Sequence, residues 1–222
     1  MQYEAAIFDL DGTLVNSLDD LADSANATLH VHGFPVHGVE AYRRFVGDGT
    51  RKLMERILPQ EYAADMGFVE QFMTEYKERY ERNLLHKTKP YNGIMDMLKE
   101  LHRCGIPMAV CTNKHQTAAE MIVGMLFPHD MFREIIGDQA GVPRKPDPQK
   151  VLRIMREFGV TGESTLYFGD TDVDMDTAHN AGVFAIGVLW GFRSEQELIE
   201  HGADILLTHP MELFEKVTFA GR

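Results

Sequence analysis

Five short apolar runs, separated by stretches with helical periodicity, restrict the fold of this chain most. Each run is almost continuously apolar rather than alternating, which is typical of strands covered on both faces. The runs occupy residues 3–8, 106–112, 133–137, 164–169 and 183–189. Helical patterns occupy residues 93–105, 117–126, 148–159 and 173–182. Regular alternation of strand and helix predicts an α/β fold built on an open parallel, Rossmann-like sheet.

One segment departs from this alternation. Residues 17–85 contain helical stretches and no convincing strand, with breakers such as Pro35 and Pro59 between them. We therefore expect two units in the 222-residue chain, since that length accommodates a domain and a smaller partner. The predicted α/β core comprises residues 1–16 and 86–222, and the predicted helical unit comprises residues 17–85.

Composition excludes several classes of function. The chain has 34 acidic residues against 22 Lys and Arg, a net charge of −12, which argues against nonspecific nucleic-acid binding. Its two cysteines, Cys104 and Cys111, form no CxxC motif, so we expect reduced thiols. The sequence shows no basic leader and no run of the ~18 apolar residues that a membrane helix requires. We expect a cytoplasmic protein that binds neither membrane nor nucleic acid; the sequence does not indicate its oligomeric state.

Two aspartates follow the first apolar run. Asp9 and Asp11 are two positions apart, so an extended chain directs both toward the carboxyl end of the strand. Ligands of open α/β sheets bind at that end. Two adjacent carboxylates raise each other's pKa unless a cation lies between them. An Asp-Gly pair is also common in turns and caps, and this stretch alone leaves both interpretations open.

A second group of acids favours the functional interpretation. Asp170 directly follows the apolar run 164–169, and three more acids follow at alternate positions. Two parallel strands that each end in aspartate bring Asp9, Asp11 and Asp170 to one edge, where carboxylate oxygens suit Mg²⁺. Asp174 is positioned to turn back toward the metal. We expect Asp172 and Asp176 to be solvated or to cap the helix.

Polar residues that suit an anion lie at other predicted strand ends. Thr112 and Asn113 follow the run 106–112, immediately before a predicted helix, where a hydroxyl and backbone amides bind anions well. An ordinary helix N-cap is the alternative for this pair. Lys145 lies between Pro143 and Pro146, in a stiff loop where it is a candidate for charge compensation.

These four stretches together resemble the haloacid dehalogenase superfamily. The match consists of Asp9-x-Asp11-Gly12-Thr13-Leu14, then Thr112-Asn113, then Lys145-Pro146, then Gly169-Asp170-x-x-x-Asp174, in chain order. Each motif is weak alone, but the ordered set is specific. The helical insertion after the first motif resembles the α-helical cap of that family.

The resemblance implies a role for each matched residue. Asp9 is the expected nucleophile that takes a phosphoryl group as an aspartyl-phosphate, and Asp11 is the expected general acid and base. Asp9, Asp170 and the backbone carbonyl of Asp11 are the expected Mg²⁺ ligands, with Asp174 ligating the metal or orienting a bound water. The expected phosphate-binding residues are Gly12, Thr112, Asn113 and Lys145.

The resemblance also favours one type of reaction over another. The dehalogenating branch has no acid at the position of Asp11 and needs no metal, so a phosphatase fits this chain better. One departure concerns Asn16, where relatives usually carry Asp; it lies where the chain leaves for the cap and bears on hydrogen bonding at the hinge.

The helical insertion is similar to that of phosphoglycolate phosphatases and their close kin. The similarity lies in the stretch FVGDGTRKLMERIL, whose Gly47, Asp48 and Gly49 would form a substrate loop, with Arg44 and Arg51 as nearby cations. A plain turn between helices is the alternative. Three other functions stay open: a sugar-phosphate mutase similar to β-phosphoglucomutase, a pyrophosphatase or broad sugar phosphatase, and a non-catalytic phospho-receiver module.

Overall fold

The chain forms two compact units in a computed structural model that describes residues 2–219. One unit contains the residues up to Val15 and those from Pro90 onward, and the other contains Asn16–Lys89. The chain therefore passes between the units twice, once after Val15 and once before Pro90.

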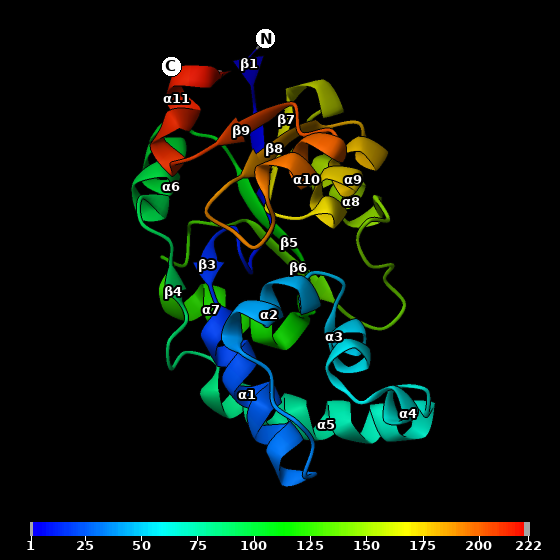
Figure 1. Cartoon of the computed structure of the whole chain (residues 1–222). Helices are drawn as coiled ribbons and strands as arrows, with labels where there is room; N and C mark the ends of the chain where they lie inside the picture. The colour runs from blue at the N-terminus through cyan, green and yellow to red at the C-terminus, as the bar shows by residue number, and fades with distance from the viewer. Residues whose placement is uncertain (1, 220–222) are drawn as a thin grey trace. The chain divides into compact units, whose positions relative to one another are not determined.

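A six-stranded, entirely parallel sheet forms the centre of the first unit, in the order β6-β5-β2-β7-β8-β9 (Figure 1). Its strands are β2 (Ala5–Phe8), β5 (Met108–His115), β6 (Glu134–Asp138), β7 (Thr165–Gly169), β8 (Phe184–Val188) and β9 (Ile205–Leu207). Every residue of β2 is buried, because β2 is a central strand with helices on both faces of the sheet. The short strands β1 (Gln2–Tyr3) and β10 (Thr218–Phe219) pair separately.

Helices cover both faces of this sheet. They are α6 (Ile94–Arg103), α7 (Gln116–Leu126), α8 (Gln149–Phe158), α9 (Asp172–Ala181), α10 (Glu195–Glu200) and α11 (Leu213–Lys216), with 3-10 turns at Gly162–Ser164 and Pro210–Glu212. Figure 1 shows α8, α9 and α10 on one side of the sheet and α6 and α11 on the other. Residues of α8 and α9 such as Ile154 and Met175 pack with Ile7 and Tyr167 in one buried cluster. The predicted α/β class with an open parallel sheet is confirmed.

Within the six-stranded sheet, the largest differences from the sequence-based expectation concern two strands. The run predicted to end at residue 112 continues as β5 to His115, with an irregular register between Cys111 and His115. Strand β9 was not predicted, because its three residues at the edge of the sheet are too few to show a pattern.

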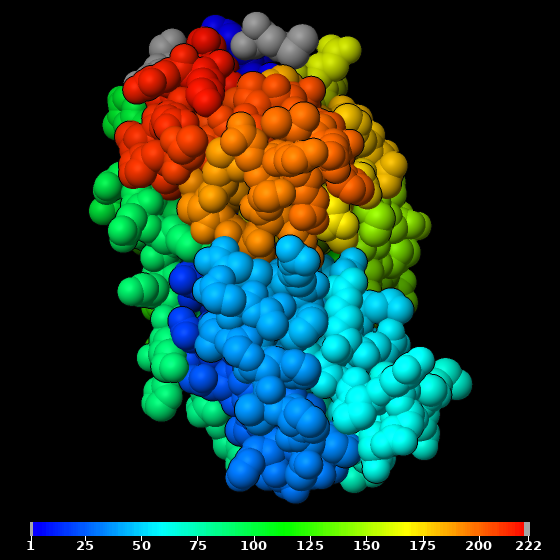
Figure 2. Space-filling model, in the orientation of Figure 1, coloured from blue at the N-terminus to red at the C-terminus, as the bar shows by residue number. Residues whose placement is uncertain are grey.

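The second unit is helical. It consists of α1 (Leu18–Val31), α2 (Val39–Phe45), α3 (Thr50–Ile57), α4 (Gln60–Ala63) and α5 (Met66–Asn83). Helix α1 packs against α5 and α2, and buried side chains such as Leu29, Tyr42 and Phe72 fill the space between the helices. In the space-filling view the blue and cyan segments of this unit form one contiguous mass (Figure 2). The short strands β3 (Val15–Asn16) and β4 (Lys89–Pro90) pair with each other where the chain passes between the units.

A buried carboxylate determines where the helical unit ends. Asp20 of α1 is 1% exposed and accepts hydrogen bonds from the backbone N–H of Lys87 and from the N–H and hydroxyl of Thr88, at 2.7–3.0 Å. These bonds hold residues 87 and 88 to α1, so residues 86–89, which the sequence analysis assigned to the core, lie in the helical unit. Asn16, at the other boundary, accepts a hydrogen bond from the N–H of Leu18 at 3.3 Å.

Replacement of Asp20 by Ala tests this anchor. The change leaves buried backbone N–H groups without an acceptor, so we expect the free energy of unfolding to fall by about 3 kcal/mol. Asp23→Ala is the matched control, since Asp23 pairs with the exposed side chain of Lys87 at 2.7 Å, and such pairs contribute about 0–1 kcal/mol. Chemical denaturation measures both values; equal losses in the two variants would contradict the assignment.

Candidate active site

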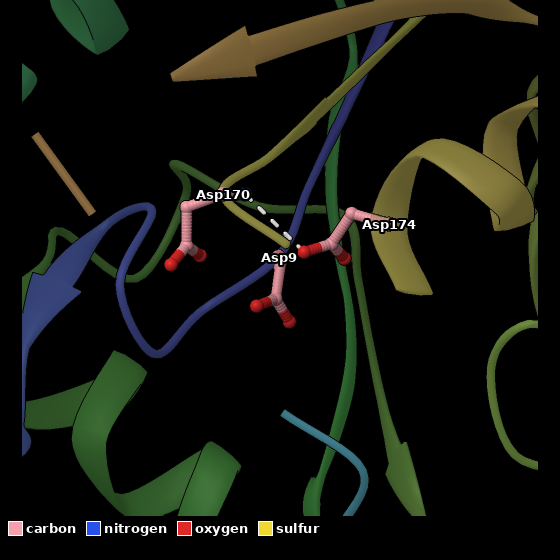
Figure 3. Close-up of side chains that lie close together, drawn as sticks. All are labelled: Asp9, Asp170 and Asp174. Carbon is pink, nitrogen blue, oxygen red and sulfur yellow. Dashed lines mark hydrogen bonds between the residues drawn. The ribbon is translucent and has the colours of Figure 1, made fainter. Parts of the chain in front are cut away.

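Three buried aspartates meet at the carboxyl ends of two neighbouring strands (Figure 3). Asp9 directly follows β2 and Asp170 directly follows β7; these strands pair in parallel, with Phe8 opposite Phe168. Asp174 lies in the first turn of α9. One carboxylate oxygen from each of the three lies within 4.8 Å of the others, and the residues are 6%, 0% and 0% exposed.

Burial perturbs the protonation of Asp9 and Asp170. It is the largest cause that raises the pKa of Asp9, from 3.8 to about 6, although the nearby Lys145 ammonium opposes it. Burial, followed by the charges of Asp174 and Asp9, raises the pKa of Asp170 well above its ordinary range. A cation placed among them removes this penalty, and three hard oxygen donors fit a divalent cation such as Mg²⁺. Within residues 2–219 no other group of three His, Cys, Asp or Glu side chains has this geometry.

Small residues and two hydrogen bonds fix the carboxylate of Asp170. The hydroxyl of Thr13 donates to Oδ1 at 2.9 Å, and the backbone N–H of Phe192 donates to Oδ2 at 2.8 Å. A Cβ atom at Gly12 or Gly191 would collide with this carboxylate. Gly12 also has φ +89°, in the left-handed region that favours glycine. The first motif therefore needs glycine at position 12 for both its backbone conformation and its contact with Asp170.

Asp174 is held by five donors. Its Oδ2 accepts from the backbone N–H groups of Asp170 and Thr171 and from the Thr171 hydroxyl, at 2.7–3.2 Å. Its Oδ1 accepts from Lys145 Nζ at 2.6 Å and from the Tyr167 hydroxyl at 3.3 Å. Thr171 and Asp174 form a capping box, so Asp174 contributes to starting α9 as well as to the acid cluster.

The neighbouring acids of α9 do not cap the helix. Asp172 lies 3.8 Å from the Arg193 guanidinium, and Asp176 pairs with His201 at 2.9 Å. The capping role that the sequence analysis considered for Asp172 and Asp176 therefore belongs to Asp174.

Lys145 joins two of the acids. Its Nζ lies 2.8 Å from Asp9 Oδ1 and 2.6 Å from Asp174 Oδ1, and the residue is 6% exposed. Burial opposes the charged form, but Asp174 and Asp9 outweigh it and raise the pKa of Lys145. The lysine is therefore a permanent positive charge beside Asp9.

Thr112 and Asn113 lie within the extended strand β5 rather than at a helix start. Helix α7 begins at Gln116 after His115, and no side chain caps it, which excludes the N-cap alternative for the pair. The Asn113 side chain accepts from the Lys145 N–H at 2.9 Å and donates to the Lys145 carbonyl oxygen at 3.2 Å. Asn113 thus ties the Lys145 loop to β5; its role as a phosphate ligand stays a prediction.

Sequence reasoning missed Lys114. Its Nζ lies 3.0 Å from both carboxylate oxygens of Asp11, and the residue is 8% exposed. The sequence did contain a hint, because Lys114 directly follows Thr112 and Asn113. It lies on β5, which neighbours the strand β2 that precedes Asp11. Thr13 belongs to the first matched motif, but its contact with Asp170 was not predicted, nor was that of Gly191, because both contacts depend on how two loops fold over Asp170.

The residues predicted for a substrate loop belong to the helical unit. Gly47 and Gly49 have φ of +119° and +87°, and Asp48 between them pairs with Arg56 at 2.5 Å. Arg51 pairs with Glu70, and Arg44 lies in α2. The role of this loop in substrate binding stays a prediction.

The described residues form no helix that combines the length and the apolar character needed to cross a membrane.

Comparison with known proteins agrees with this geometry. The family model described as haloacid dehalogenase-like hydrolase matches residues 6–188. A phosphoglycolate phosphatase of Pseudomonas putida is 35% identical over 193 residues, which cover 84% of this chain and 69% of that protein. A phosphoglycolate phosphatase of Mesorhizobium japonicum is 29% identical over 204 residues, 91% of this chain and 89% of that protein.

A solved structure is also similar to this chain over almost its whole length. A crystal structure from Lactobacillus delbrueckii subsp. bulgaricus, which carries a provisional phosphoglycolate phosphatase name, superposes with a TM-score of 0.91. It is 30% identical and covers 98% of this chain and 99% of that chain. The acid cluster at the strand ends, the four ordered motifs and these matches together show that the chain belongs to the haloacid dehalogenase-like hydrolases, in the group that resembles phosphoglycolate phosphatases.

Proposed function

We propose that this enzyme is a Mg²⁺-dependent phosphatase that hydrolyses small phosphomonoesters through an aspartyl-phosphate on Asp9. The observation that carries the proposal is the buried Asp9 carboxylate, 2.8 Å from Lys145 Nζ and within a cluster of acids that fits a hard cation. Phosphoryl transfer depends mostly on positioning and on neutralisation of charge, and these residues supply both.

Each residue has a defined task in the proposed reaction. Asp9 attacks phosphorus in line with the leaving alcohol, and Lys145 balances the negative charge of Asp9 and of the phosphoryl oxygens. Thr112 and the backbone around Gly12 hold those oxygens. Mg²⁺, held by Asp9, Asp170 and the carbonyl of Asp11 with support from Asp174, supplies positive charge at the phosphoryl group when bound.

Asp11 transfers the protons. It donates one to the leaving oxygen and then removes one from the water that attacks the aspartyl-phosphate, so both halves of the reaction use the same carboxyl group. Lys114, 3.0 Å from both of its oxygens, orients the carboxylate for this task.

2-Phosphoglycolate is the substrate that we propose first, supported by the names of the relatives. We assign the helical unit the role of a cap, with Gly47, Asp48 and Gly49 in its substrate loop. A panel of small phosphate esters tests the substrate: phosphate release from 2-phosphoglycolate is expected, whereas a need for a bisphosphate activator without phosphate release would identify a mutase. Preferred hydrolysis of pyrophosphate or of sugar phosphates would identify the other hydrolase alternatives.

Asp9→Asn removes the proposed nucleophile. The amide is almost isosteric but does not attack phosphorus, so we expect phosphate release to fall at least about a thousandfold with the fold unchanged. Steady-state phosphate assays and circular dichroism measure the two effects. Turnover within tenfold of the wild type would refute Asp9 as the nucleophile.

Mg²⁺ binding is expected to stabilise the protein in a pH-dependent way. Above pH 7 Asp9 is ionised, and a hundredfold excess of Mg²⁺ over its dissociation constant adds about 2.7 kcal/mol to the free energy of unfolding. As the pH falls through about 6, Asp9 takes up a proton and this gain declines.

For the same group we expect the opposite trend in the metal-free protein. Asp9 has a raised pKa, so the folded state binds more protons than the unfolded state between pH 3.8 and about 6, and its contribution to stability falls as the pH rises through that window. Thermal unfolding with and without Mg²⁺ at several pH values measures both effects. An unchanged Mg²⁺ effect in Asp170→Asn would place the metal elsewhere.

Lys114→Met tests the orientation of Asp11. Loss of the ammonium frees the Asp11 carboxylate to adopt other rotamers, so we expect kcat to fall about tenfold or more, whereas an exposed-lysine control, Lys99→Met, leaves it unchanged. Steady-state kinetics with one ester at saturating Mg²⁺ give the comparison. Wild-type kcat in Lys114→Met would show that the contact is incidental.

A further inference from the structure

Lys150 is a buried cation that the proposed mechanism does not use. It is the second residue of α8 and only 1% exposed. Its Nζ donates a hydrogen bond to the backbone carbonyl oxygen of Thr112, at 2.9 Å. Thr112, within β5, is expected to bind the phosphoryl group, so Lys150 contacts the backbone of a proposed phosphate-binding residue.

The irregular course of β5 explains why the Thr112 carbonyl needs a donor. Carbonyl groups of a strand point alternately to its two neighbours, and the carbonyl of Met108 accepts from the N–H of Arg133, the residue before β6. Continued in register, this ladder would bring the N–H of Gly137 to the carbonyl of Thr112. The N–H of Gly137 instead donates to the side chain of Gln116, because the register shifts between Cys111 and His115.

A neutral hydrogen-bond donor could bind the Thr112 carbonyl oxygen at a lower desolvation cost than the ammonium group of Lys150. Burial lowers the pKa of Lys150, and the charge of Lys145 acts in the same direction. A cation in the first turn of a helix also opposes the helix dipole. These penalties are offset if an anion binds nearby, which is what the proposed function requires of Thr112 and Lys145.

We propose that Lys150 is a positioning residue for the phosphate site. Its hydrogen bond fixes the Thr112 peptide in the irregular segment of β5. The Thr112 hydroxyl accepts from the Lys114 N–H at 3.2 Å and keeps its own proton to donate to the anion. The charge of Lys150 adds to that of Lys145 in attracting a phosphate dianion. This inference rests on the proposed function, because the proposed function assigns phosphate binding to Thr112 and Lys145.

The dissociation constant of inorganic phosphate tests the inference. It is measured by calorimetry with saturating Mg²⁺ in the wild type, in Lys150→Met and in Lys150→Arg. We expect about tenfold weaker binding in Lys150→Met, from loss of one buried charge, and recovery to within about threefold in Lys150→Arg. Arg156→Met is the matched control, since it removes an exposed cation from the same helix, and we expect no change there.

A purely structural role for Lys150 would lower the melting temperature of Lys150→Met without changing phosphate affinity. Wild-type affinity in folded Lys150→Met would therefore overturn the inference. Failure of the proposed function is distinguishable, since it appears as absence of turnover in the wild type, whatever Lys150 contributes to phosphate binding. Absence of phosphate binding in the wild type would overturn the inference, and the turnover assay would still decide the proposed function separately.

A measurement on the wild type covers the case in which the variants do not fold. The Lys150 ammonium nitrogen, assigned by NMR through its side-chain resonances, is expected to shift on addition of phosphate and not on addition of equal chloride. An unchanged resonance at saturating phosphate would overturn the inference.

Discussion

The buried ammonium group of Lys145 is the interaction on which the rest of the site depends. It lies within 2.8 Å of Asp9 and within 2.6 Å of Asp174, in a place where three carboxylates are almost completely shielded from water. Without a cation, such a group of carboxylates takes up protons, as the raised pKa values of Asp9 and Asp170 show. Lys145 balances part of that charge, and the residual negative charge would attract the divalent metal of the proposed function.

The α/β fold makes this arrangement possible with few residues. Parallel strands place the residues that come after them at one edge, so β2 and β7 bring Asp9 and Asp170 together although the two are far apart in sequence. The loop that carries Lys145 reaches the same edge and is tied to β5 through the two-way hydrogen bonding of Asn113. The fold therefore holds much of the site in place before a substrate binds. Charges and dipoles that are preorganised in this way stabilise a transition state without rearranging during the reaction.

The positions of five strands and their parallel direction could be predicted from the sequence, whereas contacts that depend on irregular backbone could not. Asp9 and Asp170 each follow an apolar run, which was enough to predict that both lie at the same edge of the sheet. In a parallel sheet the residues that follow the strands lie at one edge. Lys114 and Lys150 were not predicted, since their partners are determined by the shifted register of β5 between Cys111 and His115. Asp174 was expected at the metal, but its part in the capping box required the start of α9 to be known. The boundary at residue 89 depends on Asp20, whose partners lie 67 and 68 residues away.

The proposed reaction depends on a covalent bond between Asp9 and phosphorus. The most direct measurement is peptide mass spectrometry on Asp11→Asn protein mixed with Mg²⁺ and p-nitrophenyl phosphate, whose leaving group needs no proton from Asp11, and then quenched with acid. In that variant the second half of the reaction lacks its base, so the account predicts a phosphoryl group on the peptide that contains Asp9. A phosphoryl group on a different residue, or phosphate release without any labelled peptide, would contradict it.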